Sequence, residues 1–182
     1  MDRLLAAAEA DLRTYTILVL LYRVGLSSTE IIGLKAEDIA AYDNGVYIKP
    51  KGRQDACFMP EDVFVILEKY LQSDKNYFPK TQSALEGSDT EKEESEYIFL
   101  NDRGKKLNPM YISRLLKKYC KEAGVPSYSA QAIRNTCGVT MFAYGGKPEQ
   151  VAHQMGITQI QVHRYKNMSY RENLQREAAA IL

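Results

Sequence analysis

The chain has 182 residues, 45% hydrophobic and 26% charged, which is enough for one domain with a hydrophobic core. This composition excludes a wholly disordered chain, a collagen-like repeat and a low-complexity scaffold. The longest apolar run, residues 17–22, is too short to span a bilayer, and the first residues lack the features of a secretory signal. We therefore expect a cytoplasmic protein without a membrane partner.

The cysteines and histidines argue against covalent or metal crosslinks. Three widely spaced cysteines favour a reduced protein over a disulfide framework. His153 and His163 match no zinc spacing. We expect no metal and no cofactor, with Cys57 and Cys137 as small core residues.

The net charge of +1 conceals an uneven distribution. Residues 86–96 contain six acidic residues and one basic residue, so the rest of the chain carries about +6. A mildly basic body with an acidic insert fits a DNA-binding protein, although it fits many other proteins too. The sequence predicts an acidic surface loop over residues 73–96.

In chain order, the pattern predicts mostly helices. Apolar residues at helical spacing, together with cap and stop signals, indicate helices over 2–24, from 28, from Pro60, and over 109–123, 129–144, 148–155, 159–165 and 170–182.

A small sheet is predicted between the second and third of these helices. Residues 45–49 and 55–59 are strand-like, and residues 50–53 form the turn between them. The run 97–100 is short and apolar, and we expect it to be buried. The predicted fold is mainly α with a β-hairpin or three-stranded sheet (α+β), in a single domain over residues 1–182.

Five short segments, in order, resemble one family over nearly the whole chain. They are Gly25-Leu26-Ser27-Ser28-Thr29-Glu30-Ile31, Lys51-Gly52 in the hairpin, Gln131-Ala132-Ile133-Arg134, Met155-Gly156-Ile157 and Arg164-Tyr165. The chain resembles the catalytic domain of tyrosine recombinases, the phage-integrase family. Each segment alone is weakly specific, whereas their order and spacing together are fairly specific.

The resemblance implies a reaction on double-stranded DNA that uses neither metal nor nucleotide. A tyrosine hydroxyl attacks a phosphodiester and forms a 3′-phosphotyrosine. Two arginines and a histidine or tryptophan stabilise charge on the non-bridging oxygens, and a lysine protonates the leaving 5′-oxygen. A second 5′-hydroxyl can then reverse the step.

Carried over by position, the resemblance assigns three catalytic residues and three replacements. Tyr165 is the nucleophile, Arg134 the second arginine and Lys51 the hairpin lysine. The replaced positions are Ser27 for the first arginine, Gln131 for the histidine and Ile157 for the histidine or tryptophan. Glu30, the acidic residue of the first segment, is kept.

The replacements predict impaired catalysis. Loss of one preorganised donor costs about 10²–10³ in rate. Ser27 supplies no charge, Ile157 supplies no hydrogen bond, and Gln131 can donate a hydrogen bond but cannot act as a base. Arg23 lies close enough in sequence to be considered as a substitute, but Gly25 is expected to end its helix.

Structural interpretations compete with the functional ones. Arg134 could form a buried ion pair with Glu30, and Tyr165 could be an ordinary amphipathic residue. Lys51 is the preferred DNA contact of the hairpin, with Lys49 and Arg53 as alternatives.

A further set of basic residues is predicted to lie near the duplex or, equally, to form a solvated helix face. These residues are Arg114, Lys117, Lys118 and Lys121. Arg103, Lys105 and Lys106 could contact backbone phosphate for the same reason. Helix 170–182 could pack on another protomer or a recombinase partner, or on its own domain.

Three functional hypotheses follow. The first is a DNA-binding integrase or recombinase domain without the family's N-terminal clamping domain, either as a fragment or as a stand-alone relic, with weak, salt-sensitive binding. The second is a catalytically silent accessory protein that binds a recombinase or DNA. The third is a helical protein-interaction module, in which Arg134 and Lys51 have no role in binding.

Overall fold

The computed structural model describes residues 1–73, 96–101 and 104–169. Most of the predicted acidic loop and the predicted helix 170–182 lie outside the described residues. No helix in the described part is long and apolar enough to cross a bilayer.

The first predicted helix is divided into three pieces. Helix α1 spans Asp2–Ala8 and α2 spans Leu12–Val19, and the Asp11 side chain caps α2. A π-helical turn, η1, continues α2 over Leu20–Val24. Gly25 ends this run with φ 78°, a conformation that glycine adopts without a steric penalty.

The next segment carries the sheet. After α3 (Ser28–Ile32) and the 3₁₀ turn η2 (Ala36–Asp38), strands β1 (Ile39–Tyr42), β2 (Gly45–Ile48) and β3 (Cys57–Met59) pair antiparallel in the order β1-β2-β3. The predicted hairpin is β2–β3. Strand β1 was not among the predicted strands; it pairs with β2 from Ile39, which lies opposite Ile48.

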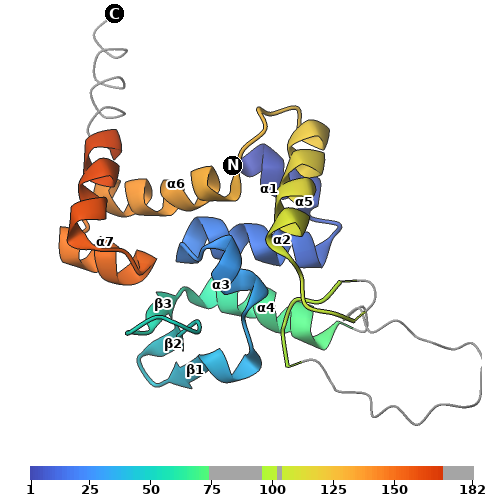
Figure 1. Ribbon diagram of the computed structural model, residues 1–182, viewed down its shortest axis with the longest axis horizontal. Coiled ribbons are helices and arrows are strands. Elements are labelled where there is room, and N and C mark those ends of the chain that lie inside the picture. Colours follow the sequence, from blue (N-terminus) through green and yellow to red (C-terminus); the bar gives the residue numbers. More distant parts are fainter. Residues whose placement is uncertain (74–95, 102–103, 170–182) are drawn as a thin grey trace, which may run out of the picture.

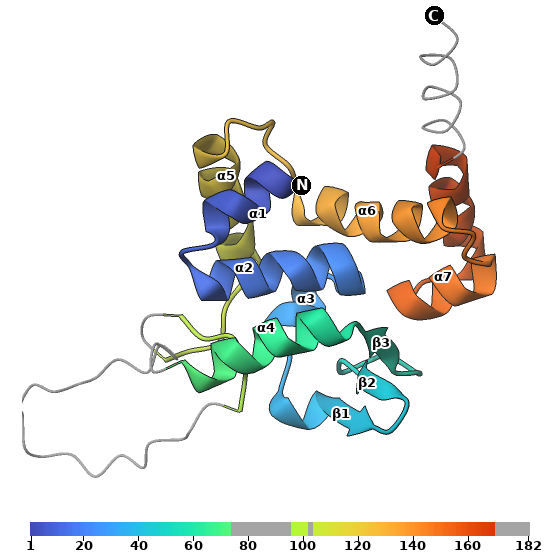
Figure 2. The same cartoon turned by 180° about the vertical axis from the view of Figure 1, so that it is seen from behind.

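The remaining elements are helical and follow the predicted spacing. They are α4 (Glu61–Gln72), α5 (Pro109–Glu122), α6 (Ala130–Ala143), α7 (Pro148–Met155) and a helix over residues 159–169. In Figure 1, α6 extends away from the group formed by α1, α2 and α5, and α7 lies at its far end. Figure 2 shows α4 running along α2, with the sheet beside its first turn.

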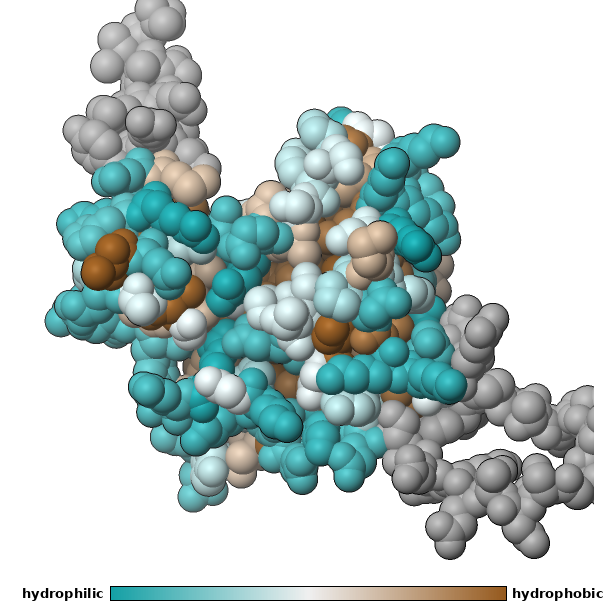
Figure 3. All heavy atoms as spheres, viewed as in Figure 1, coloured by the Kyte–Doolittle hydropathy of each residue, from teal (hydrophilic) through white to brown (hydrophobic). Residues whose placement is uncertain are grey.

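Two clusters of buried side chains stabilise this arrangement. The larger one joins the N-terminal helices, the sheet, α4 and α5. The smaller one consists of Val139, Val151, Met155 and Tyr165, and it holds α6, α7 and helix 159–169 together. In Figure 3 most of the viewed face is hydrophilic, with small separate hydrophobic patches.

The cysteines occupy core positions, as predicted. Cys57 and Cys137 are buried as free thiols. Burial raises the pKa of Cys137 to about 11, so this thiol stays protonated at neutral pH.

Candidate phosphate-binding site

The hairpin turn presents Lys51 to solvent. The backbone N–H of Arg53 donates to the carbonyl of Pro50 at 3.1 Å, which closes the predicted four-residue turn. Gly52 has φ 93°, and a positive φ at this third position is what a type II turn requires. Pro50 is buried, whereas the Lys51 side chain is exposed at the edge of a pocket.

Arg53 turns inward from the same hairpin and forms an ion pair with Glu30. Its Nε lies 2.5 Å from Glu30 Oε1, and the two side chains are only 5% and 16% exposed. Its Nη1 donates to the carbonyl of Gln154 at 2.8 Å, and its Nη2 donates to the carbonyl of Met155 at 3.4 Å. The expectation that Arg53 contacts DNA is therefore corrected, because its guanidinium is buried against protein acceptors.

Glu30 links this ion pair to the start of α3. Its carboxylate accepts a hydrogen bond from the backbone N–H of Ser27 at 2.6 Å, and the Ser27 hydroxyl accepts one from the backbone of Glu30 at 3.3 Å. This reciprocal capping box satisfies two amides of the first turn. Burial raises the pKa of Glu30, but hydrogen bonds from Arg53 and Ser27 outweigh burial and hold that pKa below its ordinary value.

Arg134 is buried, and no carboxylate of the described residues pairs with it. Its Nε donates to the carbonyl of Gly25 at 2.7 Å, and its Nη2 donates to the carbonyl of Met155. The alternative pairing of Arg134 with Glu30 is wrong, because Arg53 occupies that carboxylate. Desolvation, and to a lesser degree repulsion from Arg53, lowers the pKa of Arg134. Within the described residues its Nη1 makes no hydrogen bond and is not buried, so this edge is available to a ligand.

One pocket of about 710 Å³ joins these groups. Its lining includes the predicted residues Lys51, Arg134, Ser27 and Ile157, and also Arg53, Glu30, Thr29 and His153. Gln131 lines a smaller neighbouring pocket of about 240 Å³ together with Ser27 and Arg134. Four of the six predicted catalytic positions thus line one pocket that offers cationic and hydroxyl groups, and Gln131 lines the neighbouring one. An anion is the ligand that suits such groups.

Tyr165 lies beside this pocket but does not line it. Its ring is fully buried in the smaller cluster, against Gly138 one turn along α6 from Arg134. Its hydroxyl donates to Asn135 Oδ1 at 3.0 Å and accepts from Arg164 Nη2 at 2.6 Å. The structure therefore brings Arg134 and Lys51 together, and it holds the phenol in a separate hydrogen-bonded position.

Asn135 and Arg164 were not predicted by the sequence analysis. Asn135 Oδ1 also accepts from Gln131 Nε2 at 2.7 Å, and the Arg164 guanidinium lies 4.7 Å from the centre of the Tyr165 ring. Asn135 directly follows Arg134, and Arg164 directly precedes Tyr165. The four-residue spacing of Gln131 and Asn135 on a helix was the available signal, because residues four apart lie on one face.

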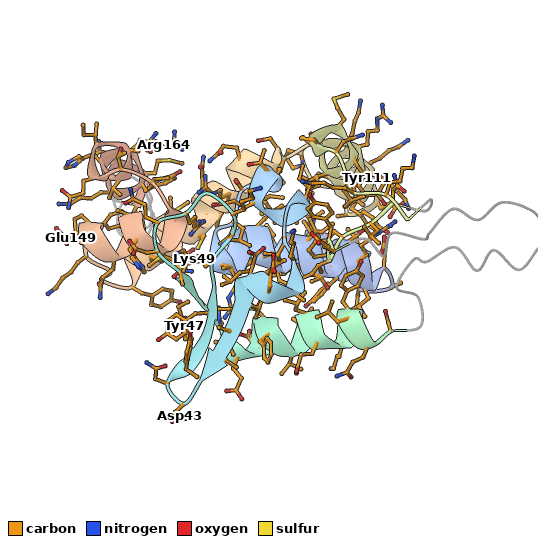
Figure 4. All side chains as sticks on the ribbon, turned by 60° about the horizontal axis from the view of Figure 1, so that its bottom comes forward. Asp43, Tyr47, Lys49, Tyr111, Glu149 and Arg164 are labelled. Atoms are coloured by element: carbon orange, nitrogen blue, oxygen red, sulfur yellow. The ribbon has the colours of Figure 1, made fainter. Side chains whose placement is uncertain are left out.

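The other basic residues are placed on the surface. Arg23 forms an exposed ion pair with Asp62 at 3.0 Å and so does not fill the position of Ser27. Lys49 is exposed on the hairpin, and in Figure 4 it lies between the sheet tip at Asp43 and the helix that carries Arg164. The predicted basic face of α5 is exposed throughout: Arg114, Lys117, Lys118 and Lys121.

A second, smaller basic pocket adjoins Lys51. Lys35, Lys51 and Lys106 line it with Tyr97 and Glu30, and its volume is about 230 Å³. Lys106 Nζ lies 4.1 Å from the centre of the Tyr97 ring, a cation–π distance. Lys105 is exposed nearby in sequence, whereas Arg103 lies outside the described residues.

Comparison with known proteins identifies the family. The sequence model of the Phage integrase family matches residues 1–172. The chain belongs to the phage integrase family. The fold agrees with this assignment. The crystal structure of XerA recombinase superposes with a TM-score of 0.72 at 19% identity, covering 97% of this chain and 60% of that chain.

Curated relatives of this family member include tyrosine recombinases. XerC of Roseiflexus castenholzii is 28% identical over 150 residues, covering 82% of this chain and 45% of the relative. XerD of Listeria monocytogenes is 24% identical over 174 residues, covering 90% and 55%. XerH, solved bound to its difH substrate after cleavage, has a TM-score of 0.73 at 17% identity and covers 99% of this chain and 50% of that chain. This chain spans about half the length of the relatives it matches.

Proposed function

We propose that this integrase-family domain binds duplex DNA and takes part in site-specific recombination by strand cleavage and rejoining. The observation that carries the proposal is the pocket that Lys51 and Arg134 line together, with no hydrogen bond from Arg134 Nη1 among the described residues. A backbone phosphate fits this chemistry, because a guanidinium edge binds phosphate oxygens in pairs and an ammonium adds a mobile proton donor.

In the proposed reaction, the Tyr165 hydroxyl gives its proton to solvent, and its oxygen forms a bond to phosphorus while the bond to the 5′-oxygen breaks. Arg134 stabilises the charge on the non-bridging oxygens, and Lys51 gives its proton to the departing 5′-oxygen. Rejoining reverses these steps, with a 5′-hydroxyl attacking the phosphotyrosine. Tyr165 must leave its bonds to Asn135 and Arg164 and move toward the pocket before it can attack.

We propose that catalysis is slow. Ser27 offers only a hydroxyl, Ile157 offers no donor, and Gln131 is engaged with Asn135. Each lost donor costs about 10²–10³ in rate, although such losses do not simply multiply. The pocket is therefore better equipped to bind a phosphate than to stabilise a transition state.

A duplex with a nick near the cleavage site tests this function, because the broken strand diffuses away and traps the covalent intermediate. We expect the wild-type chain to accumulate a DNA adduct slowly, and Tyr165→Phe to form none. Tyr144→Phe is the matched control, because the Tyr144 side chain is exposed and lies at the end of α6. Adduct formation by Tyr165→Phe would exclude Tyr165 as the nucleophile.

A second candidate function is a catalytically silent accessory protein that binds DNA or a recombinase. The buried, doubly hydrogen-bonded hydroxyl of Tyr165 favours it, because the phenol is held by Asn135 and Arg164 and does not line the pocket. This candidate predicts no adduct, with DNA or recombinase binding retained. A gel-shift titration at about 50 mM salt measures that binding, since phosphate contacts are strongest at low salt.

A further inference from the structure

We propose that Arg53 is a positioning residue that holds Lys51 at the pocket, and this inference rests on the proposed function. Arg53 has the character of an anchor rather than a ligand-binding group. Four of its five N–H groups are directed at protein acceptors: Glu30 twice, Gln154 once and Met155 once. Because its side chain is only 5% exposed and one N–H group remains, Arg53 has little exposed surface with which to bind a phosphate.

The anchor acts on Lys51 through the turn. Both ends of the turn are fixed, because Pro50 is buried and Arg53 is bound on α3 and α7. Lys51 and Gly52 between them are exposed. The backbone of Lys51 thus has a defined place, while its long side chain stays free to follow the leaving oxygen.

The anchor also fixes Lys51 relative to Arg134. The carbonyl of Met155, at the end of α7, accepts hydrogen bonds from Arg53 Nη2 and from Arg134 Nη2. One backbone oxygen therefore sets the position of both the hairpin and the buried arginine. The proton donor and the phosphate-binding edge come from distant parts of the sequence, and Arg53 connects them.

The predicted role is tested with two substrates that differ in one atom. A nicked duplex with the normal 5′-oxygen at the cleavage site needs a proton donor, whereas a duplex with sulfur there does not, because a thiolate leaves unprotonated. We expect Arg53→Gln to slow adduct formation on the oxygen substrate by about tenfold or more. The same variant should cleave the sulfur substrate at about the wild-type rate.

Further variants separate positioning from general stability. Arg53→Lys keeps the charge but loses the forked contacts, and it should show the same selective defect. Arg23→Gln removes an exposed guanidinium paired with Asp62 and should leave both rates unchanged. In a Lys51→Ala background, Arg53→Gln should add no further loss on the oxygen substrate. Equal slowing on both substrates, or full additivity with Lys51→Ala, would overturn the proposal.

The outcomes also distinguish this inference from the proposed function. If the wild-type chain cleaves neither substrate but binds duplex DNA, the same double-mutant comparison is made on the dissociation constant. Non-additive losses for Arg53→Gln and Lys51→Ala then support the inference although cleavage fails, and additive losses overturn it. A wild-type chain that neither binds nor cleaves DNA would refute the proposed function and the inference together.

Discussion

At the scale of single residues, the hydroxyl of Tyr165 is the most constrained group of the proposed reaction. It is buried, it donates to Asn135, and it accepts from Arg164. A buried polar atom that loses its hydrogen-bond partner keeps its desolvation cost. These two bonds therefore oppose movement of the phenol unless its hydroxyl gains a new hydrogen-bond partner. We infer that DNA must supply that partner.

Asn135→Ala tests this coupling in the free protein. The variant should lower the free energy of unfolding by about 1–3 kcal/mol, because the Tyr165 hydroxyl loses its acceptor. In a Tyr165→Phe background the loss should be smaller, since no hydroxyl remains to be satisfied. Urea denaturation of the four proteins measures the difference. An equal loss in both backgrounds would show that Asn135 stabilises the fold without Tyr165.

The ion pair of Glu30 and Arg53 predicts a pH dependence of stability. The folded-state pKa of Glu30 lies below its ordinary value of 4.5, because the hydrogen bonds from Arg53 and Ser27 outweigh burial. Its stabilisation is therefore complete above about pH 4.5 and is lost as the pH falls through the folded-state pKa. Glu30→Gln should cost about 3–5 kcal/mol at pH 7 and less in acid. A cost that does not change between pH 7 and pH 3 would contradict this.

His153 is a pocket residue for which the sequence indicated no role in binding. It is exposed on α7 and lines the same pocket as Arg134 and Lys51, whereas His163 is exposed outside it. We expect His153→Ala to weaken binding of a duplex by about twofold to tenfold, because one phosphate-directed donor is lost. His163→Ala is the matched control and should change the dissociation constant little. Equal changes in the dissociation constant for the two variants would show that His153 does not contact phosphate.

At the scale of elements, close contact between α6 and helix 159–169 decides where Tyr165 lies. A Cβ at Gly138 would lie 2.6 Å from Met155 Sδ and 3.1 Å from Tyr165 Cγ. The absence of a side chain at this position lets the ring pack directly on α6. The same contact places the ring at Gly138 and its hydroxyl at Asn135, outside the pocket that Arg134 lines.

In Gly138→Ala, the higher helix propensity of alanine therefore opposes the cost of overpacking against Met155 and Tyr165. Alanine favours a helix interior over glycine by about 1 kcal/mol, but overpacking at this distance costs about 1–3 kcal/mol. We expect a net loss of about 1 kcal/mol in the free energy of unfolding. Lys121→Ala on the exposed face of α5 should change it by less than about 0.5 kcal/mol. A more stable Gly138→Ala would show that Met155 and Tyr165 can move apart at little cost.

At the scale of the whole molecule, binding is expected to depend on backbone phosphates. The cations of the two pockets, Lys35, Lys51, Lys106 and Arg134, lie on one connected surface because the pockets share Lys51. The chain has a net charge of only +1, so local charge rather than net charge must attract DNA.

A salt titration of DNA binding tests this prediction. Lys51→Ala should lower the slope of log affinity against log salt by about 1, since one phosphate contact is lost. Arg3→Ala is the control, because Arg3 is exposed on α1, lies outside both pockets and is not among the predicted DNA contacts. A slope that does not change in Lys51→Ala would place Lys51 away from phosphate.

The sequence by itself determined the helices of the described residues, the hairpin turn and the family. Apolar periodicity, caps and glycines act over a few residues, so local patterns report them. The short strand β1 was missed because its four residues carry no alternation of buried and exposed positions. Order and spacing of motifs also sufficed to place Lys51, Arg134 and Ser27 at one site.

Only the tertiary structure decided which groups pair within that site. The sequence suggested Arg134 as the ion-pair partner of Glu30, whereas in the fold the carboxylate pairs with Arg53. It also buries the Tyr165 hydroxyl against Asn135 and Arg164 rather than in the pocket. The physical reason is that ion pairs and buried hydrogen bonds depend on distances of a few ångströms between segments far apart in the chain, and no local pattern encodes such distances.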